Sequence, residues 1–256
     1  MKQIFILARH TFKELVRRKD FYVLLFLFLA LAIFFYKETF FGVKDLSRYL
    51  KDIGFSLITL FSMIIAVTFS AKQIPSEIES KTVYPTLAKP VSRTHFVLGK
   101  FLGSLFISTI AFTAFYLLYL ALILAKGEGA GFALIAEGWL FSVYSLALLS
   151  SFAILLSLFF TISANVTIVF VSYFFIYWYN GVLKDLLLSS SREMSYIYGI
   201  LYYILPHFEF YDTRIRLVHL WDPLPLRVVF AVSAYTFLYI GLIIWAATAV
   251  FKRKNL

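Results

Sequence analysis

The stretch Phe96–Leu124, which reads FVLGKFLGSLFISTIAFTAFYLLYLALIL, decides the fold of this chain. Its 29 residues contain one charged side chain, that of Lys100. A membrane-spanning helix needs about 20 consecutive, mostly apolar residues. A helix over this stretch is therefore long enough to cross a bilayer.

The whole chain shares this apolar character. Of its 256 residues, 61% are hydrophobic and 15% are charged, whereas about a quarter of the residues of a soluble domain are charged. There is no cysteine, which excludes disulfides, thiolate nucleophiles and cysteine metal sites. The net charge of +10 comes from Lys and Arg at the ends of apolar runs, where they orient spans in a membrane, so we expect no nucleic-acid partner.

Similar apolar runs recur along the sequence and predict an all-α membrane protein forming a single domain over residues 1–256. We expect six transmembrane helices, at 21–36, 53–71, 96–124, 139–160, 162–179 and 228–251. The first is short, because 16 helical residues rise only about 24 Å. It has to extend past residue 36 or place Lys37 at the interface.

Residues 1–20 are predicted to form an amphipathic helix in the membrane interface. Six basic side chains lie in the first nineteen residues, and Phe5, Phe12 and Leu15 recur at helical spacing. A cleaved signal peptide is the alternative, since Ala30-Leu31-Ala32 resembles a cleavage site. The length of the charged segment before the apolar run favours the interfacial helix.

Charge predicts the orientation. With the N-terminus inside, the inner segments hold 14 basic and 4 acidic residues, and the outer segments hold 10 of each. Three tryptophans, at positions 139, 178 and 221, fall at the outer ends of predicted spans. Basic residues favour the cytoplasmic side, and tryptophan favours the interfaces. We therefore expect both termini in the cytoplasm and a multi-pass protein of the cytoplasmic (inner) membrane.

The predicted extracytoplasmic loop, 184–227, contains a short apolar stretch, Tyr196–Leu205. Ten helical residues reach about 15 Å, half of the hydrocarbon core, so we expect a re-entrant or interfacial helix before the last span. The loop also holds His207, Glu209, Asp212, His219 and Asp222. Their spacing matches no metal or catalytic motif, and we assign neither a catalytic residue nor a metal ligand, although an enzyme acting on a lipid-linked substrate at the outer leaflet remains an alternative.

Ion-driven transport is a second alternative, but such carriers usually place ionisable residues in mid-membrane. The fourth and sixth predicted spans contain no charged residue and no histidine. The fourth is instead rich in serine, which suits either close helix packing or a weakly polar wall for an amphipathic substrate. These serines are Ser142, Ser145, Ser150, Ser151 and Ser157.

The longest predicted cytoplasmic loop, 72–95, has the pattern of a helix, a break and a second helix. Pro75 suits the first turn of a short charged helix, Pro85 ends it, and Pro90 precedes the next helix. The loop leads into Gly99-Lys100, which is not part of a P-loop, because Thr94 and Phe101 stand where the motif needs Gly and Ser or Thr.

At these residues the chain resembles the permease subunits of ABC exporters of the type-2 class, which pair with separate ATPase chains. The pattern consists of Glu77, Glu79, Thr82, Lys89-Pro90, Ser92-Arg93 and Gly99-Lys100. The N-terminal amphipathic helix, the long outer loop and the basic tail are similar as well. One departure is Lys81, where many members have glycine.

The resemblance implies a permease subunit of an ATP-driven exporter that is not itself an enzyme. Its partners would be an ABC ATPase subunit, a second permease subunit in a homodimer or heterodimer, and membrane lipid. This chain would bind no cofactor, since ATP and Mg would be held by the ATPase. A coupling helix at about 76–87 would rest on that ATPase. The implied ATPase contacts are Glu77, Glu79, Lys81, Thr82, Lys89, Pro90 and Arg93, with Lys13, Arg17 and Arg18 of the N-terminal helix as a second set.

The topology can be tested by cysteine labelling, because the chain has no native cysteine. In a Lys254→Cys variant, the thiol should react with an impermeant maleimide only after the cells are permeabilised, since the basic tail is predicted to be cytoplasmic. Labelling of intact cells at this position would overturn the six-span topology.

Overall fold

The computed structural model describes residues 22–23, 26–27, 30, 46–81, 92–125, 129, 131–189 and 192–253. Over these residues the chain is helical, without a strand. The elements are α3 (Leu46–Lys72), α4 (Pro75–Glu79), α6 (Arg93–Ala125), α7 (Phe132–Leu156), α8 (Ile162–Ser189), α9 (Arg192–Ile204), the 3-10 helix η2 (Phe208–Tyr211), α10 (Arg214–His219) and α11 (Leu226–Arg253).

Five of the described helices are long and apolar enough to cross a membrane: α3, which continues into α4, and α6, α7, α8 and α11. They contain or overlap the second to the sixth predicted spans and confirm that these five stretches are helical. The interfacial helix at 1–20 lies outside the described residues, and of the first span, 21–36, only five positions are described, all helical. The sixth crossing therefore stays a prediction.

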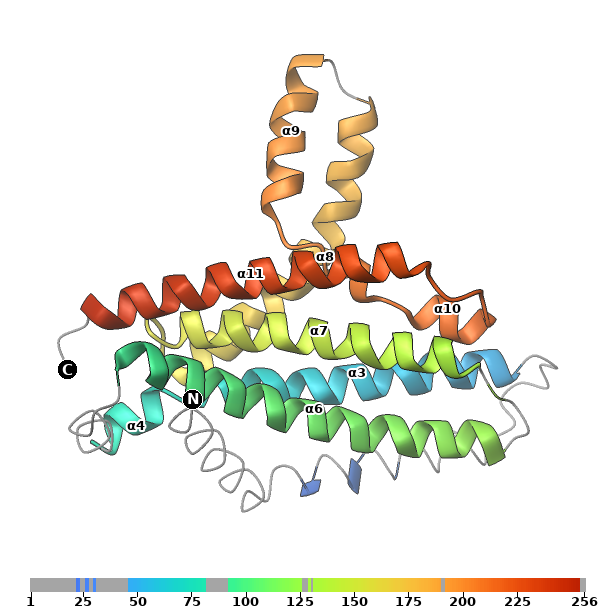
Figure 1. Ribbon diagram of the computed structural model, residues 1–256, viewed down its shortest axis with the longest axis horizontal. Coiled ribbons are helices and arrows are strands. Elements are labelled where there is room, and N and C mark those ends of the chain that lie inside the picture. The colour runs from blue at the N-terminus through green and yellow to red at the C-terminus, as the bar shows by residue number, and fades with distance from the viewer. Residues whose placement is uncertain are drawn as a thin grey trace.

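Figure 1 shows α3, α6, α7 and α11 lying along the long axis of the molecule, with α4 near one end and α10 near the other. The core lies mainly between α3, α6 and α7, where aromatic rings interlock. The ring of Phe55 meets those of Tyr116 and Tyr119 edge-on, with centroids 6.2 and 6.1 Å apart. Tyr119 also donates a hydrogen bond to the carbonyl of Lys51, 2.9 Å away, which fixes α6 against α3.

A second cluster closes the α4 end of the bundle. Phe96, at the start of α6, stacks on Phe251, at the end of α11, with centroids 5.4 Å apart. Ile74, just before α4, is fully buried in the same cluster. Gly99 and Gly103, four residues apart, are buried on α6. Small residues let helices approach closely where lipid provides no hydrophobic force between them.

The helix found at the fourth predicted span has different bounds from the prediction at both ends. We expected 139–160, but α7 covers Phe132–Leu156 and includes Glu137. The carboxylate of Glu137 can lie inside a helix because its Oε1 is 3.3 Å from Nε of Arg216 and its Oε2 accepts the backbone N–H of Leu224 at 2.8 Å. The predicted stretch 139–160 carries no charged residue, as expected, but α7 starts at Phe132 and therefore includes Glu137 as well.

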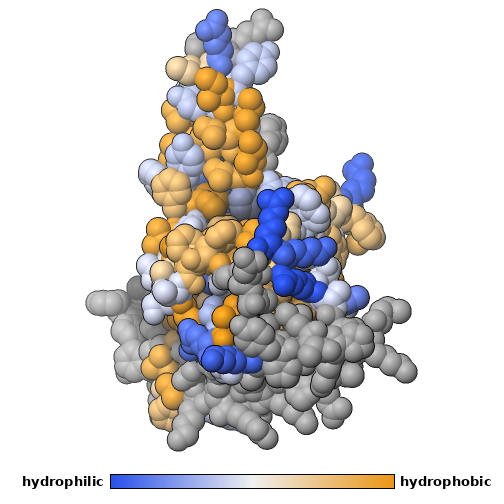
Figure 2. All heavy atoms as spheres, turned by 90° about the vertical axis from the view of Figure 1, so that its left-hand side faces the viewer, coloured by the Kyte–Doolittle hydropathy of each residue, from blue (hydrophilic) through white to orange (hydrophobic). Residues whose placement is uncertain are grey.

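The fifth predicted span also differs, since α8 continues to Ser189, well past the expected end at 179. Its last turns and α9 form a hairpin, so the loop predicted at 184–227 begins within a helix. The hairpin leaves the bundle across the direction of the spans, as both views show (Figures 1 and 2). The stretch Tyr196–Leu205 lies mostly within α9, which has 13 residues and is not one of the five candidate spans.

The tight contact between α3 and α6 at Gly54 gives a stability test. A Cβ atom at Gly54 would lie 2.8 Å from Cε2 of Tyr119, whereas a Cβ at Gly241 would have no heavy atom within 4 Å. We expect Gly54→Ala to lower the unfolding free energy by about 1–3 kcal/mol through overpacking, and the control Gly241→Ala to be tolerated. Thermal unfolding of the two purified variants checks this, and equal midpoints would contradict the packing.

Candidate functional site

The short helix α4 is held against the bundle by its own sequence. Pro75 occupies its first turn, where a missing N–H costs nothing, and Ser76 Oγ donates to the carbonyl of Lys72 at 2.6 Å. Ile74 is buried before the helix, and Ile78 packs on the same cluster. The helix thus sits on a fixed apolar base.

The two glutamates of α4 face different surroundings. Residues two apart lie on opposite sides of a helix, and Glu77 turns inward to form an ion pair with Lys100 of α6, while Glu79 is exposed. Lys100 is 4% exposed, and its Nζ also lies 5.9 Å from the ring centroid of Phe96. Glu77 therefore fastens α4 to α6 within the chain, and Glu79 points outward.

Lys81 follows α4 with φ of 57°. This left-handed conformation favours glycine, because a Cβ is strained there. The same position is the one where many of the resembling permeases carry glycine. Lys81 adopts this conformation although it is not glycine, and its side chain is exposed.

Arg93 joins the start of α6 to the end of α11. Its Nη1 donates to the carbonyls of Phe251 and Lys252 at 3.0 and 2.9 Å, and its guanidinium lies 5.9 Å from the Phe251 ring centroid. A cation at a helix C-terminus donates hydrogen bonds to the free carbonyls there and interacts favourably with the helix dipole. Arg93 thus serves the bundle, whatever else it contacts.

The remaining predicted contact residues lie outside the described part of the chain: Thr82, Lys89, Pro90, Lys13, Arg17 and Arg18. Lys100, part of the Gly99-Lys100 pattern but not among the predicted ATPase contacts, is the partner that orients α4. The sequence feature that could have identified it is a lysine within an apolar run, because such a residue needs a nearby opposite charge. Figure 2 looks onto the α4 end of the bundle and shows hydrophilic side chains there. Exposed residues at this end are Glu79, Lys81, Lys252 and Arg253.

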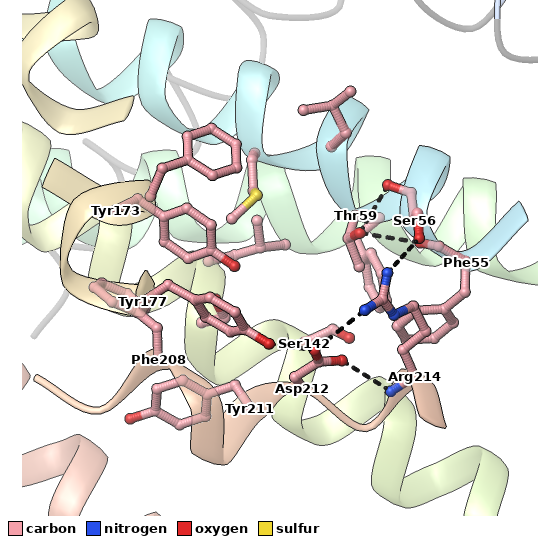
Figure 3. A pocket seen from close by; sticks show the side chains of 16 residues that line it. Phe55, Ser56, Thr59, Ser142, Tyr173, Tyr177, Phe208, Tyr211, Asp212 and Arg214 are labelled. Atoms are coloured by element: carbon pink, nitrogen blue, oxygen red, sulfur yellow. Dashed lines mark hydrogen bonds and ion pairs between the residues drawn. The ribbon is translucent and has the colours of Figure 1, made fainter. Parts of the chain in front are cut away.

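A cavity of about 440 Å³ lies between α3, α7, α8 and the segment 208–214 (Figure 3). Its lining is rich in aromatic rings, with hydroxyl groups between them. The aromatic residues are Phe55, Phe112, Tyr173, Phe174, Tyr177, Phe208 and Tyr211, and the hydroxyl residues beside them include Ser56, Thr59, Ser142 and Ser145.

One edge of this cavity carries an ion cluster. Nε of Arg214 lies 3.2 Å from Oδ1 of Asp52, and its Nη2 lies 3.8 Å from Oδ2 of Asp212. Nη1 of Arg214 donates to Ser56 Oγ at 3.1 Å, and Tyr177 donates to Asp212 Oδ2 at 2.9 Å (Figure 3). The cluster joins α3, α8 and α10, although Asp52 and Arg214 are far apart in the sequence.

The predicted serine wall divides into two groups. Ser142 and Ser145 line the cavity, whereas Ser150, Ser151 and Ser157 are buried in the bundle. The hydroxyls of Ser142, Ser151 and Ser157 donate to carbonyls of their own helix, three or four residues earlier. Most of this serine pattern therefore serves packing, and two members border a ligand-sized space.

The ionisable residues of the outer loop do not converge. His207 is buried with its Nδ1 3.6 Å from Oε1 of Glu209, Asp212 faces the cavity, and His219 lies beside Trp221. Within the described ranges, no three histidine or acidic residues gather where a metal ion could bind.

Two groups of this loop have shifted pKa values. Burial lowers the pKa of His207, although Glu209 acts in the opposite direction. Burial raises the pKa of Tyr211 to about 12, although a hydrogen bond with Thr236 opposes the shift. Tyr211 therefore stays protonated and neutral at physiological pH.

Comparison with protein families matches residues 5–256 to the family described as ABC-2 family transporter protein. The match covers nearly all of the chain, including every described helix. Comparison with curated proteins gave no match.

The ion pair between Glu77 and Lys100 can be tested against its exposed neighbour. Glu77→Gln leaves a buried ammonium without its carboxylate and should cost about 1–3 kcal/mol of unfolding free energy, a figure reduced for the partial exposure of Glu77. Glu79→Gln, the control, should cost less than about 0.5 kcal/mol. Adding Lys100→Met to Glu77→Gln should restore much of the loss. Equal unfolding midpoints for the two single variants would contradict the pairing.

Proposed function

Because the chain belongs to the ABC-2 family of transporter proteins, we propose that it is the permease subunit of an ATP-driven exporter. Five long apolar helices supply the membrane part. ATP and Mg would be bound by a separate ATPase subunit, since Gly99-Lys100 does not complete a P-loop. The chain would be a multi-pass protein of the cytoplasmic membrane, with its α4 end and both termini in the cytoplasm.

The main support for this proposal is the way in which α4 is attached to the spans. It follows α3 directly after a two-residue turn at 73–74, and its Glu77 is paired with Lys100 of α6. A force on α4 would therefore reach two spans directly. Arg93, bound to the last carbonyls of α11, would carry it to a third. This is the arrangement that a coupling helix needs.

The outward residues of α4 would supply the ATPase contact. Glu79 and Lys81 are exposed, while Glu77 and Arg93 have partners within the chain. Exposed charges at an interface steer and select a partner. We therefore assign the ATPase contact first to Glu79 and Lys81, with Thr82, Lys89, Pro90 and the N-terminal residues Lys13, Arg17 and Arg18 as further proposed contacts.

A second permease subunit would cover the least buried helices. α8 and α11 bury only 17% and 11% of their most apolar windows within the chain. The α8–α9 hairpin exposes apolar side chains at helical spacing: Val171, Phe174, Phe175 and Trp178 on α8, and Ile197, Ile200, Leu201 and Ile204 on α9.

The tip of this hairpin carries Lys184, Asp185 and Glu193, which are exposed. Exposed charges of this kind can steer and select a partner. A second permease subunit, in a homodimer or heterodimer, would pack on the apolar side chains of the hairpin. Membrane lipid would cover the rest of the apolar surface.

The coupling proposal is tested on the tagged full chain, purified from native membranes in a mild detergent. We expect a P-loop ATPase to co-purify, with native mass spectrometry giving two copies of each subunit, and ATP turnover that the chain expressed alone does not show. Glu79→Lys should weaken ATPase association at least about tenfold by reversing a contact charge.

The matched control is Asp222→Lys, an exposed carboxylate on the outer loop, which should keep the ATPase. Both variants should unfold at the wild-type temperature, because neither carboxylate is buried. ATP turnover by the isolated chain, or full ATPase association with Glu79→Lys, would overturn the proposal.

A further inference from the structure

The lining of the cavity between α3, α7, α8 and segment 208–214 has no net charge. Among its described lining residues only Asp212 and Arg214 are charged, and one carboxylate balances one guanidinium. Both oxygens of Asp212 accept hydrogen bonds within the chain, Oδ2 from Tyr177 and Oδ1 from the backbone N–H of Arg214 at 3.1 Å. A charged ligand would lose its hydration here without meeting an uncompensated opposite charge, which is costly. The lining therefore favours an uncharged ligand.

Most hydroxyl groups around the cavity already donate their hydrogen within the chain. They are those of Ser56, Thr59, Ser142, Tyr177 and Tyr211. The serine and threonine hydroxyls donate to carbonyls of their own helices. Tyr177 donates to Asp212, and Tyr211 donates to Thr236, whose own hydrogen goes to the carbonyl of Val232. These oxygens offer a ligand only their lone pairs.

The hydroxyl of Tyr173 is different, because it points into the cavity and donates to no residue in the described part of the chain (Figure 3). Its ring is held in place by two neighbours, with the ring centroids of Phe208 and Phe174 at 4.8 and 5.3 Å. Ser145 also lines the cavity, but a serine in a helix can turn its hydroxyl to its own backbone, and a tyrosine cannot. Tyr173 is therefore a fixed donor that faces the cavity.

We propose that this cavity binds an uncharged, mainly apolar molecule whose hydrogen-bond acceptor, such as a carbonyl oxygen, accepts from the Tyr173 hydroxyl, and that this molecule is the substrate of the exporter. The inference rests on the proposed permease function and adds the substrate class. Phe55, Met63 and Phe112 would contact the apolar body. A mostly apolar lining with few polar groups and a volume of about 440 Å³ is typical of small-molecule sites.

The test uses diaryl probes on the full chain in phospholipid nanodiscs, so that bilayer lipid competes throughout. Radiolabelled benzophenone is uncharged, has a carbonyl acceptor and forms covalent bonds with nearby C–H groups under ultraviolet light. We expect labelling that an excess of unlabelled benzophenone suppresses, and that peptide mass spectrometry places on α3, α7 and α8.

Competition then separates the effect of charge from that of the hydrogen bond. Diphenylmethane lacks the acceptor, whereas 4-benzoylbenzoate and (4-benzoylbenzyl)trimethylammonium keep the ketone and add a charge of either sign. After correction for the bilayer concentration of each probe, both ions should compete at least about tenfold more weakly than benzophenone. Diphenylmethane should compete about threefold to tenfold more weakly, the effect of one neutral hydrogen bond.

A tyrosine variant then locates the donor. Tyr173→Phe keeps the ring and removes the hydroxyl, so the preference for benzophenone over diphenylmethane should disappear. Tyr179→Phe, the same change on α8 outside the cavity lining, should keep that preference. Partition into the bilayer cancels in this comparison, because all proteins are in the same lipid. Unfolding midpoints confirm that each variant is folded.

Three results would overturn the inference: no saturable labelling of the folded wild-type protein, competition by either ion as strong as that by benzophenone, or an unchanged preference in Tyr173→Phe. Each would leave the permease proposal standing if the P-loop ATPase still co-purifies and responds to Glu79→Lys. Loss of that ATPase result would instead remove the permease proposal itself.

Discussion

A charge on or within an apolar helix bundle is stabilised by a close partner of opposite charge, and such pairs occur at three places in the described part of the chain. At the α4 end, Lys100 is paired with Glu77. At the cavity, Arg214 is paired with Asp52 and Asp212. Farther along α7, Glu137 is paired with Arg216. In each case one partner lies in a long span and the other in a short helix or loop, so the ion pairs fasten the connecting segments to the bundle.

The difference between long spans and short connecting segments explains what could be predicted from sequence. Five spans followed from length and hydropathy, because a run such as Phe96–Leu124 has one compatible structure in a bilayer. The start of α4 followed from Pro75, but its end did not: the coupling helix was expected at about 76–87, whereas α4 ends at Glu79 and Lys81 has a positive φ. The lateral course of the α8–α9 hairpin did not follow, since nothing in a local pattern distinguishes a helix that continues outward from one that ends at the interface.

The candidate sites were predictable to different degrees. Both glutamates of α4 were singled out, but their opposite orientations depend on Lys100, and sequence placed that residue only as a lysine near the membrane surface. The cavity could not be predicted, because Asp52 and Arg214 meet only through the folding of the outer loop across α3 and α7. Ser142 and Ser145 were noted as a weakly polar wall, and they are the part of the cavity that a local pattern could reveal.

The serine hydroxyls within the spans have a mechanical consequence. Those of Ser104, Ser108 and Ser142 donate to carbonyls of their own helices, and Thr248 does the same on α11. Such hydroxyls are satisfied without a neighbouring helix, so sliding or tilting one span past another breaks none of their hydrogen bonds. These hydroxyls therefore make the bundle interior more polar without adding hydrogen bonds between helices that such a motion would have to break.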